Sequence, residues 1–255
     1  MLLPKWRDTL IHIWTKLMAN SQEDGGVDIA GFGKIAKAIP PKVYERTADA
    51  LVQAFTQLTA PITATTAGLG KYLAQKFDNM VEAEKAIATF TVEKAVNRAM
   101  VRLHREGRQL LPPPATKPLV RSIEEASRET DPLLHEMWAN LIASQLTSED
   151  AHPHFVELLS HFSSSEARIL LDVHPLEDVG ENNGGYISMG DFDFEAWVPK
   201  SGAEPRPWTI SCALLYDLRL VAGLVPSGSE EARTTILYRT RLGTAFLKAV
   251  TQPPD

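Results

Sequence analysis

The chain has 255 residues, of which 44% are hydrophobic and 23% are charged, values that are ordinary for a soluble globular protein. Its single cysteine, Cys212, excludes an internal disulfide framework and is typical of a reducing compartment. Residues 1–150 hold 18 basic and 18 acidic residues, so the whole net charge of −6 lies in residues 151–255. An acidic C-terminal half disfavours binding to phosphate backbones, which usually needs a basic face.

The N-terminal segment predicts amphipathic helices. Trp6 and Trp14 belong to an apolar stripe with spacings of three and four residues, and "GFGKIAKAIP" sets Phe32 against Lys34 and Lys37. Trp and Lys on such helices can lie in a lipid interface, so this region is a candidate contact for a membrane or a partner. The alternative is that its apolar stripe packs onto other helices of the protein. The first residues lack a long apolar core followed by a small-residue cleavage site, so we expect no signal peptide and a protein that is cytoplasmic or peripheral at the inner membrane.

The next segment combines an uncharged stretch with a long helical one. Residues 50–70 carry no charge and are long enough to span a bilayer, but their larger apolar side chains share one side, which favours a packed amphipathic helix. Residues 71–106 contain no Gly or Pro and are rich in Ala, Glu, Lys and Arg, which predicts one long helix that could self-associate. The proline-rich stretch 107–118 then predicts a boundary, with an N-terminal helical region over 1–107.

A central helical module is predicted over residues 108–173. Its short helices are expected at 118–129, 132–146 and 153–162. Asp131 and Pro132 have the residue types of an N-cap and a first helical position, and Ser163 with Glu166 has the spacing of a capping box that starts a further helix.

Residues 174–255 change to a mixed pattern. Residues 191–195 alternate between acidic and aromatic side chains, which predicts a strand with one wet face. Residues 208–223 predict a helix, and 233–250 predict a strand that runs into a final helix. This order is typical of a winged-helix-like module. The predicted fold class is therefore mainly α, with a small winged-helix-like α+β C-terminal part.

One helix face carries residues with metal-binding chemistry. His154, Glu157 and His161 share a face of the 153–162 helix, and imidazole and carboxylate groups are common metal ligands. That face is opposite Phe155 and its apolar neighbours, so a solvated polar face explains it better. Asp191, Asp193 and Glu195 could likewise form a cation cluster, but an exposed strand is the preferred interpretation. We predict no metal and no cofactor.

Catalytic motifs are absent from the sequence. It contains no P-loop, dinucleotide-binding, nucleophile-elbow or HExxH pattern, and Cys212 lies in an apolar helix where a thiolate would be costly. We therefore expect a protein that is not an enzyme.

The winged-helix-like order suggests DNA binding as one alternative. Helix 207–222 would read a groove, with Arg219 in it and Arg233, Arg239 and Arg241 near the wing. A groove-reading helix normally carries several Arg, Lys, Asn or Gln residues on its outer face, and this one offers a single base. We expect the module to contact protein rather than DNA.

Three motifs in the central module resemble the Abi-alpha (abortive infection alpha) family. They are a "WANL-A" helix end, an "HP-F-E-L" helix start and an "EA-IL" helix. The matching residues are Trp138, Ala139, Asn140, Leu141 and Ala143; His152, Pro153, Phe155 and Glu157; and Glu166, Ala167, Ile169 and Leu170. "DLRLVAGLV" and "YRTRLGTAFL" are similar to the closing segments of that family. The resemblance implies a helical protein of anti-phage defence, without catalytic residues that can be transferred to this chain.

Within these motifs, Trp138, Asn140, His152, Pro153 and Phe155 are expected to be structural. Asn140 lies at the edge of a buried stripe, where its amide can hydrogen-bond a neighbouring helix end. The leading functional hypothesis is a non-enzymatic defence component that acts through protein partners or self-association. The alternatives are a membrane-perturbing effector that uses residues 1–70 and a DNA-binding regulator.

Overall fold

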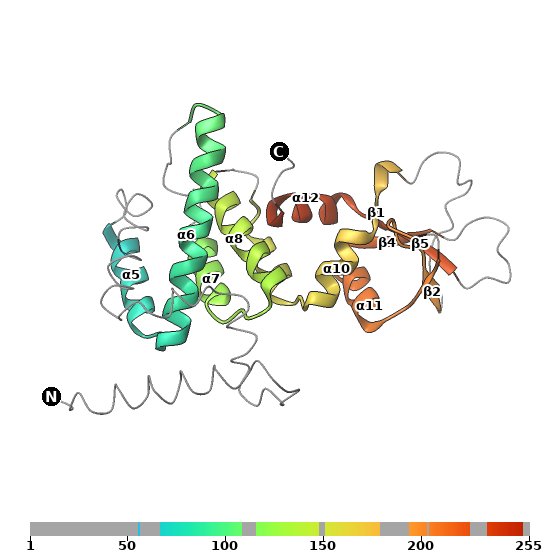
Figure 1. Ribbon diagram of the computed structural model, residues 1–255, viewed down its shortest axis with the longest axis horizontal. Coiled ribbons are helices and arrows are strands. Elements are labelled where there is room, and N and C mark those ends of the chain that lie inside the picture. The colour runs from blue at the N-terminus through green and yellow to red at the C-terminus, as the bar shows by residue number, and fades with distance from the viewer. Residues whose placement is uncertain are drawn as a thin grey trace, which may run out of the picture.

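The structure is a computed structural model, and it describes residues 56, 67–108, 116–147, 151–178, 194–202, 204–224 and 234–251. Within these residues the protein is mainly α, with a small α+β part towards its C-terminal end, as predicted (Figure 1). Its helices are α5 (Ala67–Asp78), α6 (Glu82–Arg105), α7 (Thr116–Ala126), α8 (Pro132–Thr147), α9 (His154–Ser160), α10 (Ser164–Asp172), α11 (Ile210–Asp217) and α12 (Arg241–Val250), with the 3-10 turn η1 (Leu176–Asp178). The membrane-contact candidates Trp6, Trp14, Phe32, Lys34 and Lys37 lie outside the described residues.

Among the described residues, five short strands form one sheet around β5 (Thr234–Arg239). β4 (Val221–Leu224) pairs antiparallel with β5, whereas β1 (His174–Pro175) and β2 (Ala196–Trp197) pair parallel with its two ends. β3 (Arg206–Pro207) extends β2 antiparallel. The predicted helix before β5 is present as α11, and the predicted strand that runs into the final helix is present as β5 and α12, whereas β1 and β4 were not predicted. The relation of the α+β part to winged-helix proteins stays a prediction.

The prediction of one helix over 71–106 is wrong, because the chain turns at residues 79–81. α5 ends at Asp78, and Val81 has the extended backbone of an N-cap, with ψ of 160°, before α6. Asn is a weak helix former. The turn lets Phe77 enter the same core as Ile87, and each of these side chains is at most 2% exposed. Burial of both apolar faces outweighs the helical propensity of the stretch.

The helix predicted over 208–223 is also wrong in its second half. α11 stops at Asp217, Arg219 has a positive φ of 58°, and the apolar residues from Val221 onward form β4. A short apolar run fits a buried strand as well as a helix. Backbone pairing with β5, such as Leu224 with Ile236, decides between them.

Helix α8 occupies the centre of the molecule, between α6 and α7 on one side and α10 and α12 on the other (Figure 1). Nearly every residue from Leu134 to Thr147 is buried. At its C-terminal side, the ring of Phe246 from α12 lies 5.6 Å from Phe155 and 5.3 Å from Phe162, measured between ring centroids. One apolar cluster therefore runs from Leu73 to Val250 and connects the helical and the α+β parts.

Candidate functional site

The main polar feature of the structure is a seam along α8, with α6 on one side and α12 on the other. The seam has matching rows of side chains at four-residue spacing. The α6 row is Lys94, Arg98 and Arg102, and the α8 row is Glu136, Asn140 and Ser144. Side chains four residues apart share a helix face, so each row presents a continuous polar edge to its neighbour.

At the α12 end of the seam, two α8 side chains hold the last turn of that helix. The Asn140 amide donates to the Val250 carbonyl at 3.2 Å, and the Ser144 hydroxyl donates to the Ala249 carbonyl at 2.8 Å. The last carbonyls of a helix lack partners within it, and here α8 supplies them. The prediction that Asn140 ties a neighbouring helix end is confirmed.

Arg102 completes this end of the seam from α6. Its Nη1 donates to the Ser144 hydroxyl at 3.0 Å, whereas its Nη2 and the Asn140 Oδ1 are buried without a hydrogen-bond partner among the described residues. Burial, and then the neighbouring Arg98 guanidinium, lower the pKa of Arg102. The arginine nevertheless stays charged at neutral pH, because guanidinium groups lose their proton only in strong base.

In the middle of the seam, Glu136 binds two α6 cations. Its Oε1 accepts from Lys94 Nζ and its Oε2 accepts from Arg98, whose second nitrogen also donates to the Glu136 carbonyl at 3.3 Å. Burial by itself would raise the pKa of Glu136, but the hydrogen bonds from Lys94 and Arg98 outweigh it and lower the pKa. Glu136 therefore stays ionised and links α6 to α8 as a partly exposed ion-pair network.

A buried histidine lies beside this network. His135 is 1% exposed, its Nε2 is 2.6 Å from the Thr91 Oγ1, and its ring stacks on Phe90 at 5.5 Å between centroids. The Thr91 hydroxyl donates to the Ile87 carbonyl, so the neutral His135 ring donates its Nε2 proton to that oxygen. Burial, together with the nearby Lys94, lowers the pKa of His135 to about 4. The ring is thus uncharged at neutral pH and has a structural partner.

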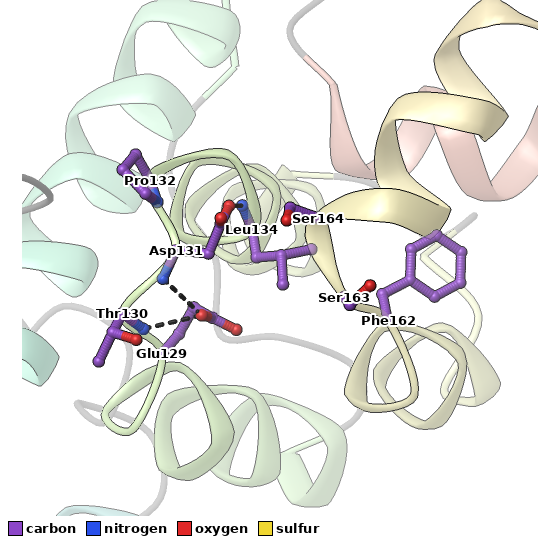
Figure 2. Close-up of a pocket in the computed structure, with 8 residues that line it drawn as sticks. All are labelled: Glu129, Thr130, Asp131, Pro132, Leu134, Phe162, Ser163 and Ser164. Atoms are coloured by element: carbon purple, nitrogen blue, oxygen red, sulfur yellow. Dashed lines mark hydrogen bonds between the residues drawn. The ribbon is translucent and has the colours of Figure 1, made fainter. Parts of the chain in front are cut away.

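A shallow pocket of about 430 Å³ lies between the N-terminal ends of α8 and α10 (Figure 2). On one wall, Glu129 accepts the backbone N–H groups of Thr130 and Asp131, both at 2.7 Å. The Asp131 Oδ1 caps α8 through Leu133 N at 2.9 Å, which confirms the predicted N-cap.

On the opposite wall, Ser163 and Glu166 form the predicted capping box of α10. Burial raises the pKa of Glu129 despite its two backbone hydrogen bonds. Leu134 and Phe162 add apolar side chains to the lining, and Leu134 is drawn between Asp131 and Ser164 (Figure 2). The polar atoms at this pocket thus serve the two helix ends.

The candidate metal ligands do not form a metal site in the structure. His154 Nδ1 lies 3.2 Å from Glu157 Oε2 on the exposed side of α9, and His161 is the C-cap residue of the same helix. In the part of the chain that the structure describes, no group of three or more His, Cys, Asp or Glu side chains is placed to hold a metal ion. Asp191 and Asp193 lie outside that part, and Glu195 is exposed next to β2.

The arginines suggested for nucleic-acid contact do not share one surface element. Arg219 is exposed in the turn after α11, Arg241 is exposed at the start of α12, and Arg233 lies outside the described residues. Arg239 is half-buried at the end of β5, and burial lowers its pKa. The backbones of Arg219, Arg239 and Arg241 nevertheless lie close together, because the hydroxyl of Thr240 donates to the Arg219 carbonyl at 2.6 Å, and DNA binding by this part stays an untested alternative.

The family motif residues divide into core and surface. Trp138, Asn140 and Phe155 are between 2% and 4% exposed, whereas His152 and Pro153 are exposed at the start of α9. His152 Nδ1 accepts the His154 backbone N–H at 3.2 Å and so caps the first turn of that helix. The expectation that all five residues are structural stays a prediction.

The α6–α8 pairing and the His135–Thr91 contact were not predicted from the sequence. The four-residue spacing of Lys94, Arg98 and Arg102 was the available signal, since it puts three cations on one face of a helix. The sequence alone does not show that α8 lies against that face.

The comparisons with known proteins give one match. No curated protein and no solved structure matches the chain. Residues 83–196 match the family described as abortive infection alpha, from the first turn of α6 to β2. The matched region begins well before Trp138, the first residue of the three central motifs. It ends before the segments "DLRLVAGLV" and "YRTRLGTAFL", so their similarity to the family stays a prediction. Residues 83–196 of this chain are therefore similar to the abortive infection alpha family, and this similarity suggests a role in abortive infection defence.

Proposed function

We propose that this protein is a non-enzymatic component of abortive infection defence against phage, and that it acts through contacts with protein. The observation that carries the proposal is the family match over residues 83–196. The seam gives further support, because Asn140, Ser144 and His135 engage carbonyls or a hydroxyl of neighbouring helices rather than an open site.

Expression of the full chain in a bacterial host, followed by challenge with a panel of phages, tests the defence role. We expect fewer plaques and early death or arrest of infected cells, compared with a host that carries the same gene with a stop codon. Normal phage yields throughout the panel, with the protein present and folded, would contradict the proposal.

The non-enzymatic part of the proposal has its own test. Replacement of both His154 and Glu157 by Ala removes the strongest candidate for surface metal chemistry, and both side chains are about half exposed, so the fold should be kept. We expect unchanged plaque counts and an unchanged melting temperature. Loss of protection that added zinc or manganese restores would instead indicate a metal-dependent reaction.

Contact with protein, rather than with DNA or lipid, is the mode of action that we propose. No helix within the described residues is long and apolar enough to cross a membrane. We expect no shift of duplex DNA at low salt and no flotation with anionic liposomes. Flotation that disappears when residues 1–40 are deleted would favour the membrane-perturbing alternative.

A further inference from the structure

The outer side of α6 differs from an ordinary solvent-exposed helix face. Met100 and Val101 are 52% and 54% exposed, and they are neighbours near the C-terminal end of the helix. Asn97 and His104 lie one turn to either side and are also exposed. The core-facing residues Ala88, Val92, Ala95, Ala99 and Leu103 lie on the opposite side. We call Asn97, Met100, Val101 and His104 the α6 outer face.

This face is apolar at its centre, with an acidic residue towards the N-terminal end of the helix and basic residues towards its C-terminal end. Glu93 lies one turn before it, and Arg105 and Arg108 lie after it. Contiguous exposed apolar side chains with a polar rim are typical of interaction surfaces, whereas a single exposed apolar residue such as Ile210, at 89%, needs no partner. In Figure 1 the C-terminal end of α6 extends past α7 and α8.

We propose that the α6 outer face binds the same face of a second copy of this chain, in an antiparallel pair related by a two-fold axis. A two-fold axis that passes between Met100 and Val101 places Met100 of one copy against Val101 of the other, and Val101 against Met100. Asn97 then lies opposite His104, a pair of amide and imidazole that can share a hydrogen bond. A two-fold interface forms each of these contacts twice.

Charge complementarity selects a second copy as the occupant and the antiparallel direction. In this direction Glu93 of each copy faces Arg108 of the other, so this contact too forms twice. A parallel pair would bring Arg105 against Arg105 and Glu93 against Glu93. Arg108 is paired with Glu106 at 3.0 Å, but both side chains are 53% exposed, and exposed pairs are weak enough to exchange partners.

The proposal deepens the proposed function by naming the protein partner, and it rests on that function only for its biological use. The pair brings two abortive infection alpha regions side by side through a helix that lies within the family match. The seam stays intact in such a pair, since Lys94, Arg98 and Arg102 keep their partners on α8.

Sedimentation of the purified full chain over a range of concentrations tests the pair. We expect a monomer–dimer equilibrium that Val101→Glu shifts towards monomer, with self-association at least about tenfold weaker. Ile210→Glu is the matched control, since it adds the same charge at an exposed apolar residue of α11 and should leave the equilibrium unchanged. Melting curves confirm that both variants are folded.

Charge reversal tests the direction of the pair. Glu93→Arg and Arg108→Glu should each weaken the dimer, and the double variant should recover it. A cross-linking series adds a geometric readout, because Val101→Cys lies next to the axis and should form a disulfide with its copy faster than Ile210→Cys. A monomeric wild-type chain, or a dimer that resists both Val101→Glu and charge reversal, would overturn the proposal.

The phage assay separates this proposal from the proposed function. If a chain that stays monomeric protects cells from phage, the proposed α6 pair is wrong and the proposed defence role is supported. If the chain forms a dimer that depends on Val101 but never reduces phage yield, the proposed defence role is wrong and the α6 pair is supported. Loss of protection and of the dimer together in Val101→Glu supports both.

Discussion

At the residue scale, the buried polar side chains His135, Asn140 and Ser144 of α8 each form a hydrogen bond with a neighbouring helix. Asn140 is 4% exposed and donates a hydrogen bond to the Val250 carbonyl of α12. His135 is 1% exposed, and burial lowers its pKa so that the ring is neutral. A buried polar group stabilises the native state only while its partner is in place, because desolvation without a hydrogen bond costs free energy. Substitutions here should therefore act on stability first.

Asn140→Leu removes the donor to the Val250 carbonyl and puts a larger apolar side chain in a packed position. We expect the free energy of unfolding to fall by about 1–3 kcal/mol, measured by urea denaturation. Phage protection should fall only as far as folded protein is lost. Arg168→Leu, at an exposed position of α10, is the control and should change stability by less than about 0.5 kcal/mol. Loss of protection with an unchanged unfolding curve would indicate a direct functional role for Asn140.

His135 predicts a pH dependence of stability. Its pKa is about 4 in the folded protein and 6.5 in the unfolded chain, so between these values only the unfolded chain takes up the proton. Stability should be constant above pH 6.5 and should fall as the pH drops towards 4, by up to about 3 kcal/mol from this residue.

The charged groups around His135 also influence its protonation. Lys94 and Arg98 oppose protonation of the ring, and Glu136 favours it. The measurement is therefore the difference between the unfolding free energies of wild type and His135→Gln at each pH, since Gln keeps a donor for Thr91. A difference that does not change between pH 7 and pH 4 would show that His135 is not the group responsible.

At the element scale, helix ends are set locally, whereas helix contacts need particular neighbours. α12 begins with Thr240, whose side chain accepts the Gly243 backbone N–H at 3.0 Å, and then packs directly onto the Leu220 backbone. Gly243 has no Cβ, and this lets the two backbones approach.

Gly243→Ala tests that close approach. An added Cβ would lie 2.0 Å from the Leu220 carbonyl oxygen, which is backbone and cannot rotate away. We expect a loss of at least about 2–3 kcal/mol of unfolding free energy. Gly202→Ala is the matched control, because its Cβ would only reach Pro199 Cγ at 3.6 Å, an ordinary contact. Equal stability of the two variants would mean that α12 shifts at no cost.

At the scale of the whole molecule, α8 joins the helical and α+β parts through one core. Phe246 of α12 is fully buried and packs on Phe155 and Phe162, while α6 covers the other side of α8. Sequence composition suggested three parts, 1–107, 108–173 and 174–255, and this division stays a prediction. The described residues share a single apolar cluster across its boundaries, so we expect them to unfold together.

Phe246→Ala tests this shared unfolding. The substitution should cost about 3–5 kcal/mol through the cavity it leaves. Helix content and tryptophan fluorescence should still change in one coincident transition at lower denaturant. Leu242→Ala on the exposed side of α12, at 36% exposure, should cost less than about 1 kcal/mol. Two separate transitions in the Phe246 variant would show that the C-terminal part unfolds independently.

The sequence by itself determined what depends on near neighbours. The N-cap Asp131, the capping box of Ser163 and Glu166 and the family motifs were all readable from the sequence, because the residues that form each of them lie close together in the chain. Only the tertiary structure decided the turn at residues 79–81, the strand from Val221 and the Arg102–Ser144 contact. These depend on atoms distant along the chain, where burial and strand pairing outweigh local propensity.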